Sequence, residues 1–539
     1  MTLVSAVSYG VAPAAVIQVP ADQPTVQAGI DAASMMDTVL VAEGTYVENL
    51  RITYPIHLAS HYLLDGDTAH QTRTILDGSS PTSPDTASVI LMIDAATATV
   101  QGFTITGGRG TRWQDLSDGL YYREGGGILT ESGTPRIIDN LIIGNEAVDV
   151  AGGLRSGGGG AIRCGYGTAE IKNNVIAYNA GHYGGGIVAF HNPVTIQNNV
   201  IYRNRGGKDF GGGGIWITSS AGTNSVINNT IMENVSDRDG GGILLWSNSA
   251  NLRNNLLWGN VAGNDPQIQL RSGASATSVS YSNVEGGWTG TGNIDALPDL
   301  EANNCVLTET SPGVDAGDPS LINYDPPDPN QSSLARYPAR GARHNDMGAY
   351  GGRGCKAFPL FTAPGADVPV TLVDFGTVAV GDMGTRYIRV AKSAYGVVEF
   401  DSTQTAGTFA PDLELTTALP VRLGPAAADN ADSLALTWTP STYGLLDDTL
   451  FIHHDDATVA SPFAVVLQGL APGKTGDPNM DDMINSSDVI YLVNYVFKGG
   501  PAPLPVNRAG DVDCSGQITS SDVIYMVSYV FKGGPAPCL

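Results

Sequence analysis

A short unit recurs along the first half of the chain and limits what this chain can fold into. Runs of glycine lead into an isoleucine five times, at Ile128, Ile162, Ile187, Ile215 and Ile243. Each of these isoleucines is followed by the pattern Ile-x-Asn-Asn-x-Ile-x-x-Asn or a close variant of it. Such a repeat predicts an array of similar structural units rather than one irregular globular core.

The pattern inside each unit predicts short strands joined by sharp corners. Apolar residues alternate with a period of two, which is typical of strands. Asparagine and glycine lie between them, and these residues tolerate left-handed backbone angles. Stacking the units about 4.8 Å apart would pair each strand with the next copy. The isoleucines would then form inward columns, and the asparagine amides would hydrogen-bond along the axis. We therefore predict a parallel β-helix. A leucine-rich repeat would need regularly spaced leucines and helical segments, and the sequence has neither.

The repeat and its flanks resemble the pectate-lyase-like right-handed parallel β-helix superfamily, in its bacterial surface-protein branch. Residues 17–48 resemble the N-terminal cap and first coil, and residues 281–288, 311–318 and 346–351 resemble the C-terminal coils and closure. The resemblance covers roughly residues 17 to 355. It implies the fold but leaves the activity open, because this scaffold hosts lyases, hydrolases, esterases and non-catalytic adhesins.

The glycine runs stop after the repeat, and a second kind of β-structure is expected. Alternating strands such as Val370–Phe375 and Arg386–Val390 are separated by turn residues at the spacing of a sandwich. The segments Phe375–Gly381 and Trp438–Pro440 resemble the start and the end of abnormal-spindle/hydin-type immunoglobulin-like domains. We read this part as a spacer or a binding sandwich.

Two nearly identical acidic segments near the C-terminus, Asp477–Asp488 and Asp511–Asp522, predict calcium loops. Both carry side-chain oxygens at loop positions 1, 3, 5, 9 and 12, and position 7 offers a backbone carbonyl. Calcium takes six to eight oxygen ligands, and this spacing wraps a loop around one ion. Position 6 needs a sharp turn, which Gly516 supplies and Asp482 tolerates. The predicted Ca²⁺ ligands are Asp477, Asn479, Asp481, Met483, Asn485 and Asp488, and Asp511, Asp513, Ser515, Gln517, Thr519 and Asp522.

One helix is expected after each loop, over 489–498 and 523–532, and each ends at Gly-Gly-Pro. A calcium loop with one following helix resembles the dockerin module of secreted carbohydrate-active proteins. The resemblance implies a cohesin-like or other surface protein as partner of residues 472–539. In that family the residues at loop positions 10 and 11 help to read the partner, here Ser486, Ser487, Ser520 and Ser521. The usual basic pair on the helix is absent, so the partner need not be a cohesin.

The expected fold class is therefore mainly β: a right-handed parallel β-helix, then an Ig-like β-sandwich, then a small α-helical dockerin-like calcium module. We expect a signal or leader over residues 1–16, the β-helix over 17–356, the sandwich over 357–471 and the calcium module over 472–539. The leader is small and apolar but lacks a basic start, so a secretory signal and an unstructured leader both remain open.

Five cysteines are too few for a disulfide scaffold, and the odd count leaves at least one unpaired. Cys514 and Cys538 could tie the second loop to the C-terminal tail, and Cys305 with Cys355 is another candidate pair. Cys164 falls on an inward position. A disulfide would fit a secreted, extracellular or cell-surface protein.

The formal net charge of −25 argues against a nucleic-acid partner. No stretch approaches the ~18 uninterrupted apolar residues that a membrane-spanning helix needs.

A candidate glycan site lies on the outside of the predicted β-helix. Counting back six positions from Ile215 and Ile243 places Asp209 and Asp237 in neighbouring coils, about one strand spacing apart. Glu124 and Asp149 lie in comparable loops of earlier coils. The candidate catalytic residues are Asp209, Asp237, Asp239, Arg238 and Lys208. Strand alternation points Arg163, Phe190, Trp216 and Trp246 outward, where exposed aromatic rings suit sugar stacking. The alternative is that the loop charges pair with one another and that the aromatic residues meet another loop.

Two functions fit these observations. The first is a secreted protein that binds or cleaves polysaccharide, as a lyase or glycoside hydrolase if it is an enzyme, held in an assembly by a calcium-loaded tail. The second is a non-catalytic structural or adhesive surface protein, in which the β-helix is a rigid rod.

Overall fold

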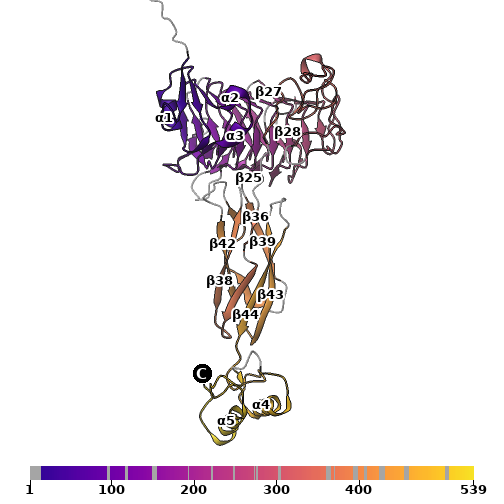
Figure 1. Ribbon diagram of the computed structural model, residues 1–539. Coiled ribbons are helices and arrows are strands. Elements are labelled where there is room, and N and C mark those ends of the chain that lie inside the picture. The colour runs from indigo at the N-terminus through magenta and orange to yellow at the C-terminus, as the bar shows by residue number, and fades with distance from the viewer. Residues whose placement is uncertain are drawn as a thin grey trace, which may run out of the picture. The chain divides into compact units, whose positions relative to one another are not determined.

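The computed structural model describes residues 14–538 apart from short segments at 94–96, 116–118, 148–154, 192, 220–221, 247–248, 272–273, 275–276, 302–304, 360–365, 370, 393–397, 406–409, 424–430, 455–460 and 504–508. Two compact units make up the chain (Figure 1). Residues to Pro364 form the first unit, and residues 365–393, 398–423 and 430–539 form the second. The predicted leader lies outside the described residues up to residue 13, and a strand already begins at Val16.

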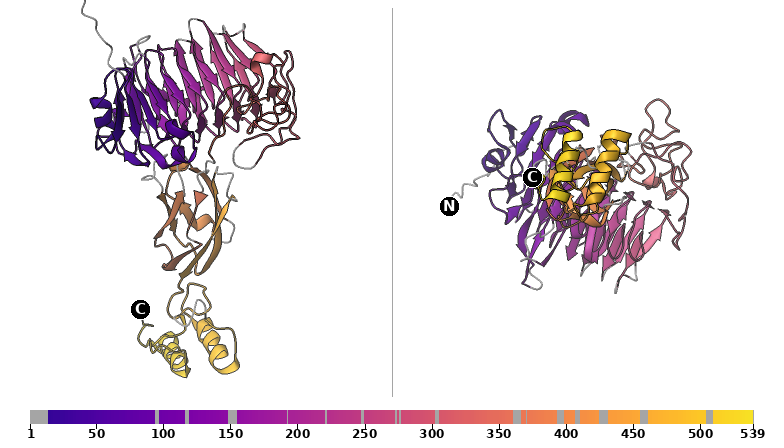
Figure 2. Two further views of the ribbon diagram at one scale, coloured as in Figure 1. Left: turned by 45° about the horizontal axis from the view of Figure 1, so that its top comes forward. Right: turned by 90° about the horizontal axis from the view of Figure 1, so that it is seen from below.

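The first unit is a parallel β-helix, as the repeat predicts, and its strands stack in register from coil to coil (Figure 2). Sheet I consists of β1 (Val16–Val19), β2 (Thr38–Val41), β5 (His57–Ser60), β9 (Thr99–Gln101), β14 (Arg136–Ile138), β19 (Glu170–Lys172), β23 (Thr195–Gln197), β27 (Thr223–Ile227), β31 (Ser249–Arg253) and β34 (Ser278–Ser280). Sheet II consists of β3 (Gly44–Val47), β6 (Thr74–Asp77), β10 (Thr104–Thr106), β15 (Leu141–Ile143), β20 (Val175–Ala177), β24 (Val200–Tyr202), β28 (Thr230–Met232), β32 (Leu256–Trp258) and β35 (Asn283–Val284).

Two further sheets complete the coils. Sheet III consists of β4 (Leu50–Ile52), β8 (Ile90–Met92), β13 (Ile128–Thr130), β18 (Ile162–Cys164), β22 (Ile187–His191), β26 (Ile215–Ser219), β30 (Ile243–Trp246) and β33 (Ile268–Leu270). Sheet IV consists of β7 (Thr86–Ala87), β11 (Gly110–Gln114), β12 (Tyr121–Glu124), β17 (Arg155–Gly158), β21 (Ala180–Tyr183), β25 (Arg205–Gly211) and β29 (Val235–Ser236), with β16 (Glu146–Ala147) paired to β21. Sheet IV forms from the segments just before the glycine runs, which the sequence suggested only as loops.

The isoleucines after the glycine runs form one inward column of sheet III. Ile162 pairs with Ile128 and Ile187, and Ile215 pairs with Ile187 and Ile243. All five are fully buried in the same core, which also holds Cys164. The inward position predicted for Cys164 is therefore confirmed.

Two ladders of buried asparagine run along the corners, as predicted. In each ladder the side-chain amide of one coil donates to the side-chain oxygen of the next. One ladder comprises Asn140, Asn174, Asn199, Asn229 and Asn255, and the other comprises Asn145, Asn179, Asn204, Asn234 and Asn260. The residue before each member of the first ladder has a left-handed backbone, with φ between 52° and 58°: Asp139, Asn173, Asn198, Asn228 and Asn254.

Residues 345–358 form a strap that runs back along the outside of the coils, beside Asn228, Asn198 and Asp139. Residues 346–351, expected in the C-terminal coils and closure, form no strand of a coil and belong to this strap. The Asn228 side-chain amide donates to Asn345 and to the Asp346 carbonyl, and Lys356 Nζ lies 2.8 Å from both carboxylate oxygens of Asp139. Tyr350 and Phe358 pack on the outer face of sheet II. The strap therefore closes one side of the β-helix.

Helices are few in the first unit. The helix α1 (Val26–Ala32) covers the first coil, and Val26 and Ile30 join the interior core. The short helices α2 (Tyr62–Asp65) and α3 (Ala69–Arg73) and the 3₁₀ turn η1 (Leu321–Asn323) lie outside the coils. Among the described residues, no helix is both long and apolar enough to cross a membrane.

The second unit begins with two β-sheets that share one core. The strands β36 (Ala366–Asp367), β38 (Gly384–Lys392), β42 (Ala431–Trp438) and β40 (Leu413–Leu415) form one sheet. The strands β37 (Leu372–Thr377), β44 (Phe463–Ala471), β43 (Gly444–His454), β39 (Val398–Thr405) and β41 (Val421–Leu423) form the other, and the 3₁₀ turn η2 spans Ala410–Asp412. Trp438 is fully buried between the sheets and meets Phe375 edge-on.

The unit ends with the two predicted helices, α4 (Ser486–Lys498) and α5 (Ser520–Lys532). Each begins three residues before its predicted start, because Asn485 and Thr519 cap the helices from inside the loops. Each ends at a glycine with φ of 67°, as the Gly-Gly-Pro segments indicate. Cys514 and Cys538 form the predicted disulfide. The suggested pair Cys305 and Cys355 is wrong, since both are free thiols.

Candidate functional site

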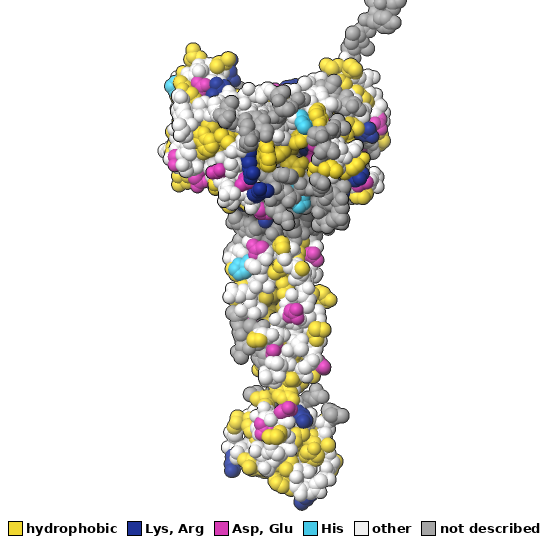
Figure 3. All heavy atoms as spheres, turned by 180° about the vertical axis from the view of Figure 1, so that it is seen from behind, with side chains coloured by type: hydrophobic (Ala, Val, Ile, Leu, Met, Phe, Trp, Pro, Cys, Tyr) yellow, Lys and Arg dark blue, Asp and Glu magenta, His cyan; other side chains and the backbone are white. Residues whose placement is uncertain are grey.

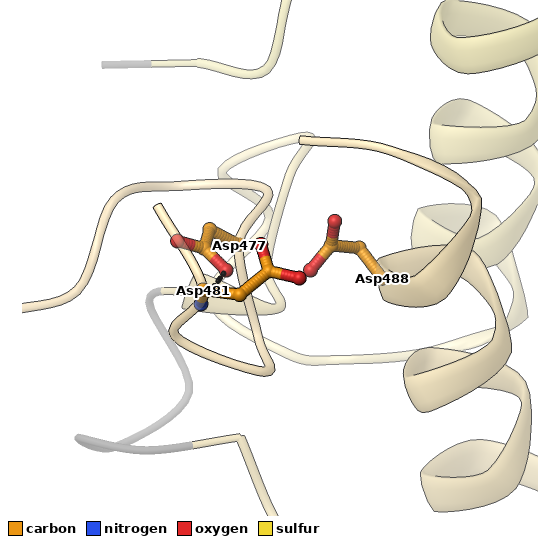
Figure 4. Close-up of side chains that lie close together, drawn as sticks. All are labelled: Asp477, Asp481 and Asp488. Carbon is orange, nitrogen blue, oxygen red and sulfur yellow. Dashed lines mark hydrogen bonds between the residues drawn. The ribbon is translucent and has the colours of Figure 1, made fainter. Parts of the chain in front are cut away.

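The first acidic loop brings three aspartates together (Figure 4). One carboxylate oxygen from each of Asp477, Asp481 and Asp488 lies within 4.8 Å of the other two. Asp477 and Asp488 are fully buried. Calcium–oxygen distances are about 2.3–2.6 Å, so oxygens on opposite sides of one ion lie about 5 Å apart. The spacing of the three carboxylates therefore matches a calcium site.

The second loop repeats this arrangement with Asp511, Asp513 and Asp522. Backbone amides orient the first and last of them: Gly516 N donates to Asp511 at 2.7 Å, and Val512 N donates to Asp522 at 2.9 Å. In the first loop, Asp482 N donates in the same way to Asp477 at 2.8 Å. Both loops thus gather three carboxylates, from positions 1, 5 and 12 in the first loop and from positions 1, 3 and 12 in the second.

Left-handed residues produce the turns of both loops. Position 4 has φ of 61° in Met480 and 57° in Cys514, and position 6 has φ of 64° in Asp482 and 88° in Gly516. The sharp turn predicted at position 6 is therefore present in both loops. A capping box closes each loop, because Asn485 or Thr519 caps the helix while Asp488 or Asp522 bonds back to the cap amide.

The electrostatics of the first loop favour a bound cation. The Oδ1 atom of Asp488 is buried and accepts no well-aligned hydrogen bond from the described residues, although the Asn479 amide lies near enough to the carboxyl group to lower its pKa. Burial raises the pKa of Asp488 to about 6, and the nearby charges of Asp477 and Asp481 contribute. A divalent cation would satisfy the orphaned oxygen and offset this repulsion. In the second loop a hydrogen bond from Ser515 lowers the pKa of Asp513.

The remaining predicted ligands lie in the same loops with smaller roles. The oxygen of Asn479 accepts the Asp481 amide at 3.1 Å, and the Ser515 hydroxyl donates to the Gln517 carbonyl at 3.1 Å. Asn485 and Thr519 use their side-chain oxygens to cap the helices. The Met483 side chain is exposed, which fits a role through its backbone carbonyl alone.

The predicted partner-reading serines are accessible. Ser486, Ser487, Ser520 and Ser521 are all exposed in the first turns of α4 and α5. The same helices expose large apolar side chains at matching positions: Ile490, Phe497, Ile524 and Phe531, each at least 60% exposed. Figure 3 shows hydrophobic side chains on the visible face of this C-terminal module. Sequence analysis missed these four residues, although their spacing of seven along each helix identifies one face.

Two of the candidate catalytic acids on the β-helix, Asp237 and Asp239, are engaged in ion pairs. Asp239 is buried and bonds Arg271, and it also contacts Arg238 Nε at 3.3 Å. Asp237 lies 3.6 Å from Arg205. Lys208 and Asp209 belong to β25, but their side chains are outside the described residues, as is Asp149. Gly206 pairs with Ser236, and Ile215 pairs with Ile243 further along. The segment from Gly206 to Ile215 is longer than the segment from Ser236 to Ile243. The prediction that Asp209 stacks on Asp237 assumes equal lengths between the paired strands and the glycine runs. The extra length in the earlier coil breaks that alignment.

The four predicted sugar-contacting residues point away from the interior core, but the exposure expected for two of them is wrong. Trp216 is 6% exposed, because Tyr183 of β21 packs edge-on against it with ring centres 5.1 Å apart. Arg163 is 1% exposed. Phe190 and Trp246 are half-buried, and the Phe190 ring stacks on Trp216 at 5.9 Å. Sheet IV thus covers much of the face that strand alternation suggested was open.

Arg163 is held by acids from earlier coils. Its guanidinium pairs with Glu124 and Glu131, and Asp115 lies 4.0 Å away. The Tyr183 hydroxyl donates to Glu124. Burial raises the pKa of Glu131 to about 7 against the lowering effect of Arg163. Glu124 is therefore part of a buried ionic cluster and not a loop acid open to substrate.

Comparison with known families supports the fold of the first unit. The sequence matches a family described as "Right handed beta helix region" over residues 47–231 and 88–284. Together with the parallel ladders, this match shows that this part of the chain is a right-handed parallel β-helix. No curated protein matches the sequence.

Three solved structures that match each cover about a fifth of the chain. One is a domain of human CEP192 described as ASH / PapD-like (10% identity, 20% of this chain and 84% of that chain, TM-score 0.17). Another is a protein of unknown function from Porphyromonas gingivalis W83 (14% identity, 20% of this chain and 46% of that chain, TM-score 0.17). A third is a family 123 glycoside hydrolase from Clostridium perfringens (7% identity, 22% of this chain and 29% of that chain, TM-score 0.17). These scores are too low to identify a fold.

Proposed function

We propose that this is a secreted or cell-surface protein whose residues 472–539 form a dockerin-like module that binds two calcium ions and attaches the β-helix to a partner protein. The convergence of three aspartates in each of two duplicated loops carries the proposal. The buried Oδ1 of Asp488, which accepts no well-aligned hydrogen bond, supports it, because a buried carboxylate oxygen needs a cation or a donor. The disulfide fits an oxidising compartment.

Calorimetric titration of the full chain with calcium chloride tests the metal sites. We expect two sites in the wild-type protein, one in Asp477→Ala, one in Asp511→Ala and none in the double variant. Asp482→Gly is the matched control, because Asp482 lies in the first loop but at a turn position where the second loop has Gly516. This variant should keep both sites. A wild-type protein that takes up no calcium would remove the basis of the proposal.

The partner that we propose is a cohesin-like or other surface protein that contacts α4 or α5. The exposed serine pairs and the exposed Ile490, Phe497, Ile524 and Phe531 support contact through these helix faces. A purified cohesin domain should be retained by the immobilised chain in calcium and released by EDTA. Ile490→Ser with Ile524→Ser should weaken retention, and Ile322→Ser, an exposed isoleucine of the first unit, should not. Retention that ignores calcium would contradict this role.

Residues 357–471 then serve as an Ig-like spacer. The two sheets around Trp438 and Phe375 support this assignment.

We propose that the β-helix itself binds polysaccharide without cleaving it. Half-buried aromatic residues along the outer face of sheet III support binding: Phe190 lies beside Trp216, and Tyr166 stacks on His191 at 4.2 Å. Retention on immobilised uronate and neutral glycans should fall in Phe190→Ala with Trp246→Ala. The appearance of unsaturated or reducing ends that are lost in Asp237→Ala and Asp209→Ala would instead establish an enzyme. A chain that retains no glycan would favour the structural or adhesive alternative.

A further inference from the structure

One difference between the two repeats concerns a covalent bond. Cys514 occupies position 4 of the second loop, where the first loop has Met480. Cys538 follows the second Gly-Gly-Pro-Ala-Pro segment, and Leu504 follows the first. Both partners of the Cys514–Cys538 disulfide are therefore apolar residues in the first repeat. The first repeat therefore shows that such a module folds without the bond, although its loop also differs at positions 2, 3, 5, 6, 7 and 9.

The disulfide encloses most of the second calcium loop. The bond joins residues 24 positions apart, and the chain between them contains Ser515, Gln517, Thr519 and Asp522 and the whole of α5. Cys514 therefore lies between Asp513 and Ser515, the predicted ligands at loop positions 3 and 5. The bond therefore couples the position of the C-terminal tail to that of the loop.

The tail beyond α5 is docked by further contacts. Cys538 N donates to the Val512 carbonyl at 3.1 Å, beside the first ligand position of the loop. The Tyr525 hydroxyl donates to the Ala536 carbonyl at 3.0 Å. Pro537 lies so close to Gly476 that a Cβ there would come within 2.7 Å of its ring. The tail is therefore a fixed anchor for the bond.

We propose that the Cys514–Cys538 disulfide positions the second calcium loop, so that this site binds calcium more tightly when the bond is intact, while the first site does not depend on it. The inference rests on the proposed function. A calcium loop must be ordered to bind, and ordering before binding lowers the entropic cost of binding. The two clusters have the same count of three aspartates, so acidic charge within the cluster does not distinguish them. The disulfide is thus a positioning element for the second site.

Reduction of the bond in the full chain tests the proposal. A dithiol such as dithiothreitol supplies two electrons and two protons, which convert the disulfide into two thiols while the reagent closes into its own cyclic disulfide. Asp477→Ala leaves the second site, and Asp511→Ala leaves the first. Calcium titration should show that reduction weakens the second site about tenfold and changes the first site by less than about twofold. Equal weakening of both sites, or an unchanged second site, overturns the proposal.

A variant that copies the first repeat separates loss of the bond from side effects of the reagent. Cys514→Met with Cys538→Leu, made in the Asp477→Ala chain, should show the weakened affinity without reductant and no further change with it. Hydrogen exchange of α5 at saturating calcium should match that of the Asp477→Ala parent, which establishes that the module still folds. The same affinity as the oxidised parent would overturn the proposal. Failure of the proposed function looks different, because no variant would then take up calcium in either redox state.

Discussion

Single asparagines hold the corners of the β-helix through several hydrogen bonds each. The side-chain oxygen of Asn199 accepts the backbone amide of Asn174 at 2.9 Å. Its side-chain amide donates to the carbonyl of Ile171 and to the side chain of Asn229. The residue is fully buried. Water cannot replace these bonds inside the core, so the ladder is costly to interrupt.

Replacing Asn199 by leucine should therefore lower the free energy of unfolding of the first unit by roughly 3 kcal/mol, since buried donors and acceptors lose their partners. Urea unfolding followed by hydrogen exchange of the β-helix measures this. Asn251→Leu, in a half-buried outward position of β31, is the control and should cost far less. Similar losses in the two variants would mean that the ladder adds no stability.

Lys392 gives the second unit a dependence on pH. The residue is 5% exposed at the end of β38, and burial lowers its pKa to about 8. An unfolded lysine titrates near 10.4. Between these values the unfolded state binds the extra proton, so stability should rise as pH increases, by up to about 1.4 kcal/mol per pH unit.

Lys392→Met should abolish this rise, because methionine fills the site without a charge. Urea unfolding at pH 7 and pH 10, followed through exchange of amides in β38 and β42, compares the two proteins. A slope that is equal in wild type and variant would show that another group is responsible.

Among single residues, the roles that could be predicted from the sequence are those that occur in several copies of the repeat. The asparagine ladders and the inward isoleucines recur within the same local pattern although the distance between copies varies, and the two acidic loops repeat in the same way. The burial of Arg163 could not be predicted, because alternation gives the side of a strand but not what covers it. Glu124 and Tyr183, which cover it, come from segments of variable length before the glycine runs.

Among the elements, the stacked strands could be predicted from the repeat. The strap and sheet IV, which cover those strands, could not. The strap over 345–358 has no internal period, and its contacts with Asn228 and Asp139 join positions far apart in sequence. The strands of sheet IV lie where coil lengths differ. These additions decide which outer faces remain open, and hence where a glycan could bind.

Trp216 should act mainly through packing. Trp216→Ala removes a buried ring that contacts Tyr183 and Leu244, so it should destabilise the β-helix by roughly 3–4 kcal/mol. Trp246→Ala removes a half-buried ring in the next coil and should cost clearly less. Urea unfolding of the first unit compares them. Equal destabilisation would indicate that the two rings are equally covered.

For the whole molecule, calcium should matter to one unit alone. Both acidic clusters lie in the second unit, and the β-helix is held by its own ladders and core. Because metal binding contributes to folding, EDTA should speed amide exchange in residues 472–539. Exchange in residues 17–356 should stay unchanged. Faster exchange across the β-helix after EDTA would point to a cation site there.

The helix α1 has a consequence beyond the first coil. Within residues 14–538 as described, β1, β3 and β4 are the first strands of their sheets, so each presents an edge that no earlier described strand pairs with. α1 lies over this end and contributes Val26 and Ile30 to the core. Open edges recruit other strands. A chain that lacks residues 14–32 loses both β1 and this cover, so the edges of β2, β3 and β4 should make it associate, which size-exclusion chromatography would detect.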